Sequence, residues 1–115
     1  MARKLILLLL AAGMLASVLL WERYSLARQG ERDFAALGCV SCHFSGGGPN
    51  LTHVVRKHDD KLLSQFIGDP GSVYRARNMQ SLNEGFGHMP QLQTTPQNVR
   101  AIIAYLHELD RTDKQ

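Results

Sequence analysis

Hydrophobic residues form three patterns along the chain, and each of them predicts a helix. Residues 5–20 are an almost unbroken apolar run, with 14 apolar side chains in 16. A second group recurs on one helical face and predicts a helix over 59–68: Leu62, Leu63, Phe66 and Ile67. A third group forms a longer stripe, made of Val99, Ile102, Ile103, Leu106 and Leu109. This stripe predicts a last helix that Thr95 caps and Pro96 begins.

A polar stretch separates the second pattern from the third. Residues 71–94 are broken by Gly85, Gly87 and Pro90, and they predict a long loop with at most one short helical turn. A loop of this length is uncommon in a small domain unless it carries function.

The N-terminal run predicts a segment that enters a membrane. Arg3 and Lys4 precede it, so the chain from about Trp21 onward is expected outside the cytoplasm. Sixteen helical residues span about 24 Å, slightly less than a hydrocarbon core of about 30 Å. Two outcomes stay open. Residues 5–21 remain as a single-pass anchor, which we favour, or the chain is cleaved near Ala27 and becomes soluble.

Composition and charge narrow the classes of protein. The 115 residues allow one small domain, predicted over 30–115, after a signal-anchor or signal peptide and juxtamembrane linker over 1–29. The pI near 9.1 comes from the leader, because residues 31–115 carry equal numbers of basic and acidic side chains. A nucleic-acid-binding face is therefore not expected. Residues 31–115 are poor in apolar side chains, so their thin core is expected to need a disulfide, a metal or a cofactor.

Cys39-Val40-Ser41-Cys42-His43 is the attachment sequence of a c-type haem. Each thiol adds to one haem vinyl group, and the adjacent histidine can then turn Nε2 toward the iron. Three other readings fit less well. A thioredoxin-like pair needs a preceding strand, a zinc site needs four ligands, and a disulfide across three residues restrains little chain. The motif predicts one haem c bound covalently through Cys39 and Cys42.

Residues on both sides of the motif resemble the class I cytochrome c family, from Gly30 to Leu109. The resemblance implies an all-α fold of three to five helices wrapped around one covalent haem, here preceded by the N-terminal apolar helix. It implies a first helix over about 31–38, in which Gly30 allows a second helix to approach and Phe34 packs beside the haem. It also implies that the Pro49 carbonyl accepts the Nδ1–H of His43, the proximal ligand.

The sixth ligand follows from the same resemblance. Met89 lies 46 residues after His43 and precedes Pro90, as in short bacterial members of the family. Met79, His88 and an open position are the alternatives. His53, His58 and His107 are expected to be solvated side chains. Arg75 and Arg77, beside Tyr74, are candidates for binding the haem propionates, although a solvated basic cluster explains them equally well.

Together these features predict an electron carrier with no catalytic residues. It would exchange electrons with unidentified redox proteins of a respiratory chain, on the periplasmic side of the inner membrane of a Gram-negative bacterium. One alternative is a haem c subunit of a larger membrane oxidoreductase. Another is a haem sensor or peroxidase-like enzyme, which would require an open sixth position. The chain without haem is expected to be largely unfolded.

Overall fold

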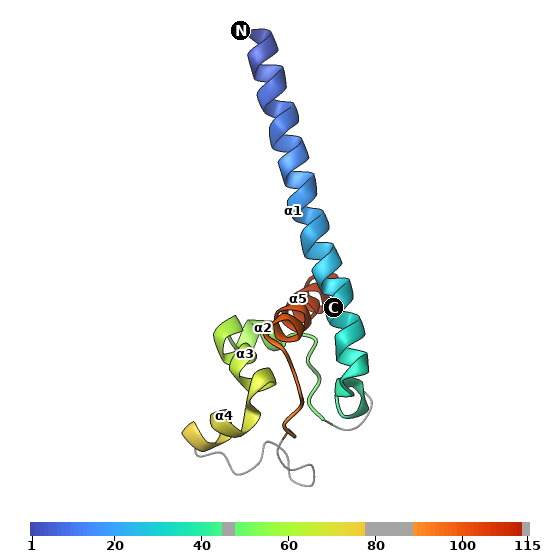
Figure 1. Ribbon diagram of the computed structural model, residues 1–115, viewed down its shortest axis with the longest axis vertical. Helices are drawn as coiled ribbons and strands as arrows, with labels where there is room; N and C mark the ends of the chain where they lie inside the picture. The colour runs from blue at the N-terminus through green and yellow to red at the C-terminus, as the bar shows by residue number, and fades with distance from the viewer. Residues whose placement is uncertain (45–47, 78–88, 114–115) are drawn as a thin grey trace.

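The computed structural model describes residues 1–44, 48–77 and 89–113, and it contains no strand among them. Five α-helices and one 3₁₀ turn follow one another along the chain (Figure 1): α1 (Ala2–Ala36), η1 (Cys39–Ser41), α2 (Val54–Lys57), α3 (Asp60–Gly68), α4 (Pro70–Ala76) and α5 (Pro96–Thr112). The molecule measures 67 × 28 × 24 Å, because α1 projects far beyond the other helices. The predicted all-α class is confirmed.

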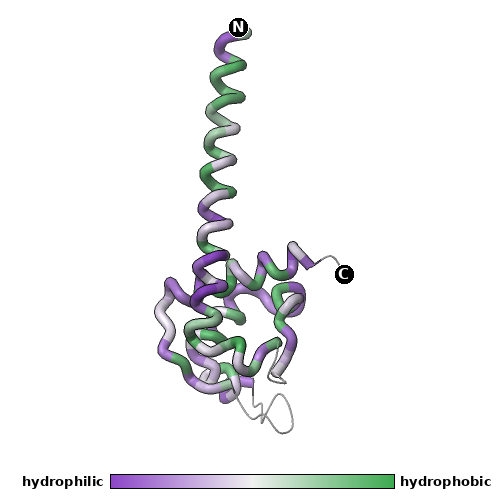
Figure 2. Tube along the Cα trace, turned by 90° about the vertical axis from the view of Figure 1, so that its right-hand side faces the viewer, coloured by the Kyte–Doolittle hydropathy of each residue, from purple (hydrophilic) through white to green (hydrophobic). Residues whose placement is uncertain are grey.

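Helix α1 joins the apolar run and the first helix of the second part without a break. The helix predicted over 31–38 is the end of α1, which stops at Ala36. The division predicted between residues 29 and 30 therefore falls inside a continuous helix. Its first half presents exposed apolar side chains on all sides, seen as the green stretch in Figure 2. Within the described residues it alone is long and apolar enough to cross a membrane.

The second half of α1 packs against α5, and small residues make the crossing close. Ala27, Gly30 and Phe34 are the buried residues of α1 and lie about one turn apart. A Cβ atom on Gly30 would overlap the backbone carbonyl of Ala101 on α5. The ring of Phe34 meets that of Tyr105 edge to face, with centroids 5.6 Å apart. The predicted approach of a second helix at Gly30 is present.

Helix α5 begins where the sequence predicts. Thr95 is the N-cap of this helix. The Thr95 hydroxyl accepts the Asn98 N–H and the Asn98 side chain accepts the Thr95 N–H, which together form a capping box. The Asn98 amide also donates to Asp33 on α1 over 3.1 Å, which links the two helices. The buried residues include four members of the predicted stripe, together with Ala101: Val99, Ile102, Ile103 and Leu106. The fifth member, Leu109, is partly buried against the same core.

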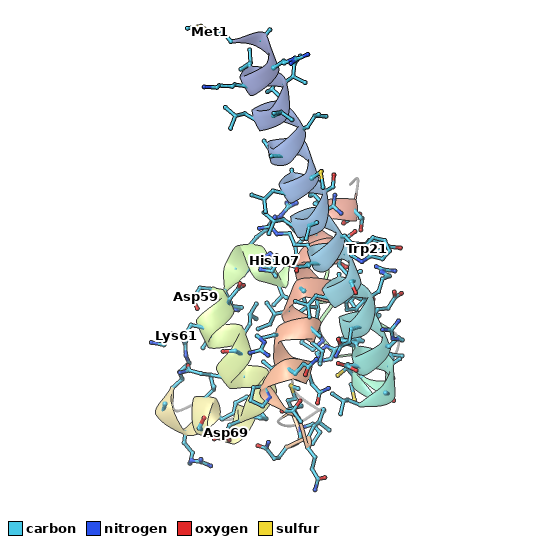
Figure 3. The ribbon with its side chains drawn as sticks, turned by 45° about the horizontal axis from the view of Figure 1, so that its top comes forward. Met1, Trp21, Asp59, Lys61, Asp69 and His107 are labelled. Carbon is cyan, nitrogen blue, oxygen red and sulfur yellow. The ribbon has the colours of Figure 1, made fainter. Side chains whose placement is uncertain are left out.

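Helices α3 and α4 complete the domain beside α5. Helix α3 matches the predicted helix over 59–68, and the Asp59 side chain accepts the Leu62 N–H at its start (2.8 Å). Helix α4 occupies seven residues where the sequence predicted loop or a single turn. Asp69 caps it and Pro70 fills the first position, which favours a helix start. Figure 3 shows Asp59 and Asp69 at the two ends of α3.

The histidines differ from the expectation in one case. His58 is exposed, whereas His53 is partly buried and contacts Asp110 and Asp113 through its two ring nitrogens (2.7 and 2.8 Å). The expectation that His53 is solvated is therefore wrong. The hydrogen bond from His53, with further help from Arg56, lowers the pKa of the Asp110 carboxyl. His107 is exposed on α5 and contacts Asp60 at the start of α3 (2.7 Å).

Candidate haem site

The two cysteines lie on a tight turn immediately after α1. Gly38 ends the helix with a φ of 82°, a left-handed conformation that glycine adopts without strain. The N–H groups of Cys42 and His43 then both donate to the Cys39 carbonyl, at 3.3 and 3.0 Å. This turn brings the three chemically active side chains of the motif together on one short segment. Both cysteines are free thiols.

The two thiols have different surroundings. Cys39 is 9% exposed and packs with Phe34, Ile102 and Leu106, whereas Cys42 is exposed. Burial raises the pKa of the Cys39 thiol, so it stays protonated at neutral pH. A thioredoxin-like cysteine requires the opposite shift, because the thiolate is its reactive form. The structure therefore gives no support to the thioredoxin-like alternative.

The His43 ring is held by a hydrogen bond to the backbone. Its Nδ1 lies 2.8 Å from the carbonyl oxygen of Pro49. A carbonyl can only accept, so Nδ1 carries the hydrogen and Nε2 of the neutral ring keeps its lone pair. Such a bond fixes the tautomer and orientation of a metal-binding histidine and raises its basicity. This is the contact that the family resemblance implies for Pro49.

The absence of a side chain at Gly48 allows the Pro49 segment to approach His43. Its N–H donates to the Cys42 carbonyl over 2.7 Å, and a Cβ atom at this position would lie only 2.7 Å from that oxygen. A side chain there would push the Pro49 segment away from the motif. Gly46 and Gly47, which precede Gly48, lie outside the described residues.

Met89 is partly buried, and its backbone is tied to α4. Its N–H donates to the hydroxyl of Tyr74 over 2.9 Å. Tyr74 is 4% exposed and packs edge to face against Phe66, with ring centroids 5.2 Å apart. Nothing in the sequence pairs Tyr74 with Met89, because the two are fifteen residues apart and meet only through the tertiary fold. The sequence had placed Tyr74 with the propionate candidates instead.

The remaining candidates are less well defined by the fold. Arg75 and Arg77 are exposed at the end of α4, and their role toward haem propionates stays a prediction. Met79 and His88, the alternative sixth ligands, lie outside the described residues. Across the described ranges, no three histidine, cysteine or acidic side chains are grouped closely enough to hold a metal ion. A zinc site therefore gains no support from these residues.

An apolar wall lies beside the motif and suits a haem. The Phe34 ring is tilted against those of His43 and Phe44, with ring centroids 6.4 and 5.8 Å apart. Residues from every helix after the motif except α4 join this cluster, together with the segments before α2 and α5: Leu51, Val54, Val55, Ile67, Leu92, Ile102, Leu106 and Leu109. Two thiols, an imidazole with one free nitrogen and an apolar wall are the groups that a covalently bound haem requires.

Comparison with known proteins agrees with this donor set. The family model described as Cytochrome c matches residues 27–110, which is most of the chain. No curated protein and no solved structure matches significantly. The family binds haem c covalently through cysteines spaced as Cys39 and Cys42 are, and its members carry electrons. The fold, the attachment motif and the family match together show that this chain belongs to the cytochrome c family.

Proposed function

We propose that the chain carries electrons at the periplasmic face of a bacterial inner membrane, with His43 and Met89 as the axial ligands of one haem c. The observation that carries the proposal is the hydrogen bond between His43 Nδ1 and the Pro49 carbonyl, on the same turn as two free thiols. It leaves His43 Nε2 free to bind a metal, next to both points of covalent attachment.

The chain's own residues account for electron transfer rather than catalysis. The haem supplies a one-electron couple between Fe(II) and Fe(III). His43 is fixed by Pro49, and the Met89 backbone is fixed by Tyr74, so neither ligand needs to move when the charge changes. If His43 and Met89 both bound the iron, no position on it would be open to a substrate. A thioether ligand also favours the reduced state and raises the potential.

Burial of Ala27 supports a retained anchor over cleavage. Ala27 is 2% exposed and is the first residue of α1 that packs in the core. The peptide bonds around it lie in the middle of a continuous helix. Cleavage after Ala27 would remove this residue and would leave the haem domain with a frayed first turn. We therefore propose that residues 5–21 hold the protein in the membrane.

Replacement of Met89 tests the ligand assignment. In Met89→Ala, we expect the oxidised protein to lose the weak far-red methionine–iron band and the reduced protein to bind carbon monoxide. The midpoint potential should fall by on the order of 0.2 V, a fraction of the range of about 0.8 V that axial ligands control. Met14→Ala, in the exposed first half of α1, is the matched control. An unchanged spectrum and potential in Met89→Ala would show that another group ligates the iron.

A further inference from the structure

The membrane-spanning part of α1 and the part that builds the haem domain are one uninterrupted helix. Between the end of the apolar run and the first buried residue, Ala27, the six residues from Trp21 to Leu26 contain neither proline nor glycine. A helix interior without these residues has no local cause to bend. Figures 1 and 2, turned by 90° from each other, both show α1 passing straight from the projecting end into the domain.

Side chains three or four residues apart support the helix across this junction. The rings of Trp21 and Tyr24 lie with centroids 6.1 Å apart, and the Arg28 guanidinium lies 5.5 Å from the Tyr24 ring centre. Arg28 also forms an ion pair with Glu31 one turn further on. Side chains at these spacings are neighbours on a helix surface, and such pairs stabilise the local helix. The junction is therefore continuously supported from the membrane interface to the packed part of α1.

Packing against α5 prevents the domain from turning about this helix. The close contact of Gly30 with Ala101, the buried Phe34 and the bond from Asn98 to Asp33 all lie within about one turn of α1. The domain cannot rotate or tilt on α1 without breaking these contacts. From Trp21 to Ala36 the helix rises about 22 Å, so the attachment motif starts at that distance from the lipid boundary.

We propose that α1 is a rigid helix that fixes both the height and the orientation of the haem above the membrane. We also propose that the electron-transfer partner of this protein is a redox protein bound to the same membrane. A fixed height and orientation remove most of the rotational search for a partner that diffuses in the same plane. They give no such advantage with a partner that arrives from solution in every orientation. This inference rests on the proposed anchor and electron-transfer function.

Orientation can be measured directly on the full-length holoprotein in stacked, oriented phospholipid bilayers. We expect the electron paramagnetic resonance signals of the oxidised haem to change as the sample is turned in the magnetic field. A six-residue Gly-Ser insertion between Ser25 and Leu26 should abolish that dependence, whereas six alanines at the same place should preserve it. A wild-type signal that is independent of the angle, or an angular dependence that survives the Gly-Ser insertion, would contradict the proposal that α1 fixes the haem orientation.

The partner is tested by helical phasing in native membranes. Each alanine inserted after Ser25 turns the domain by about 100° and raises it by about 1.5 Å. We expect haem reduction by respiring membranes to slow about tenfold with two alanines and to recover substantially with four, which restore the phase to within about 40°. A rate of haem reduction that does not change with the insertions would contradict the proposal of a membrane-bound partner. The optical spectrum of each variant reports the haem site independently, so loss of haem ligation is distinguished from loss of the fixed orientation.

Discussion

Tyr74 is a small part of the haem domain, but its hydroxyl holds the backbone of Met89. The tyrosine is buried and its ring is held by Phe66, so its hydroxyl has little freedom to follow Met89 if that segment moves. The Met89 N–H in turn has the Tyr74 hydroxyl as its hydrogen-bond acceptor, at 2.9 Å. A buried aromatic side chain on α4 thus holds the backbone next to the sulfur that we propose as the sixth ligand.

Tyr74→Phe removes this hydrogen bond and keeps the ring. A typical intramolecular hydrogen bond contributes about 1 kcal/mol, so the equilibrium between bound and released methionine should shift about fivefold toward release. We expect the far-red band of the oxidised protein to disappear at a lower pH or lower denaturant concentration than in the wild type. Tyr105→Phe, which alters a tyrosine that packs on α1 instead, is the control. Equal behaviour of the two variants would contradict the role of Tyr74.

The sequence predicts the residues of the motif far better than it predicts their supports. Cys39, Cys42 and His43 follow from spacing alone, because covalent attachment requires these groups within a few residues. Pro49 follows only from the family resemblance. Tyr74 and Gly48 could not be predicted in their observed contacts, since a contact between two distant segments depends on how the helices pack and not on a local pattern.

At the scale of elements, the crossing of α1 and α5 depends on the absence of a side chain at Gly30. A methyl group there would overlap the Ala101 carbonyl, and backbone atoms of a packed helix cannot move aside easily. We expect Gly30→Ala to destabilise the holoprotein by about 1–3 kcal/mol, the usual cost of overpacking, despite the better helix propensity of alanine. Thermal unfolding followed in the haem absorption band measures this change.

Gly13→Ala provides the matched control for this prediction. Gly13 lies in the same helix with no atom within 4 Å of an added Cβ, so the substitution should leave the unfolding temperature of the haem domain unchanged. If both variants unfold at the wild-type temperature, the close crossing at Gly30 does not hold the domain together.

Helices with a clear apolar face were predicted well, and continuity between helices was not. Helix α5 combines a capping residue, a proline at its start and a complete stripe, so its existence and its start follow from the sequence. The single helix of α1 could not be predicted, because an apolar run and an amphipathic helix give different patterns and the residues between them favour neither an end nor a continuation. Helix α4 is too short to show a period, and only the cap at Asp69 and Pro70 indicates it.

For the whole molecule, the composition predicts a domain that depends on its cofactor. Among the described residues beyond α1, few apolar side chains are fully or largely buried, and most of those lie on α5. A haem placed against the apolar wall around Phe34 and Leu106 would add the largest apolar group of the core. Small domains with thin cores commonly need such an addition to fold.

The double variant Cys39→Ala, Cys42→Ala tests this dependence, because it cannot attach haem covalently. We expect its helical circular dichroism in detergent to fall to about the level of the exposed apolar half of α1. The remaining chain should show no cooperative thermal transition and should be cleaved rapidly by protease. Met89→Ala, which keeps both thiols, should remain folded. A cooperative transition in the double cysteine variant would show that the chain folds without its cofactor.

The pairing of α1 with α5 also sets an order of events while the protein is made. The two cysteines leave the ribosome about sixty residues before Ala101, an interval of about 3–12 s at 5–20 residues per second. Until α5 arrives, α1 has nothing to pack against at Gly30, and Cys39, which the finished fold buries, stands on an open chain. The late synthesis of the last helix therefore leaves both thiols open for at least these seconds, and because the domain is expected to fold only with haem, α5 should cover Cys39 after attachment and not before it.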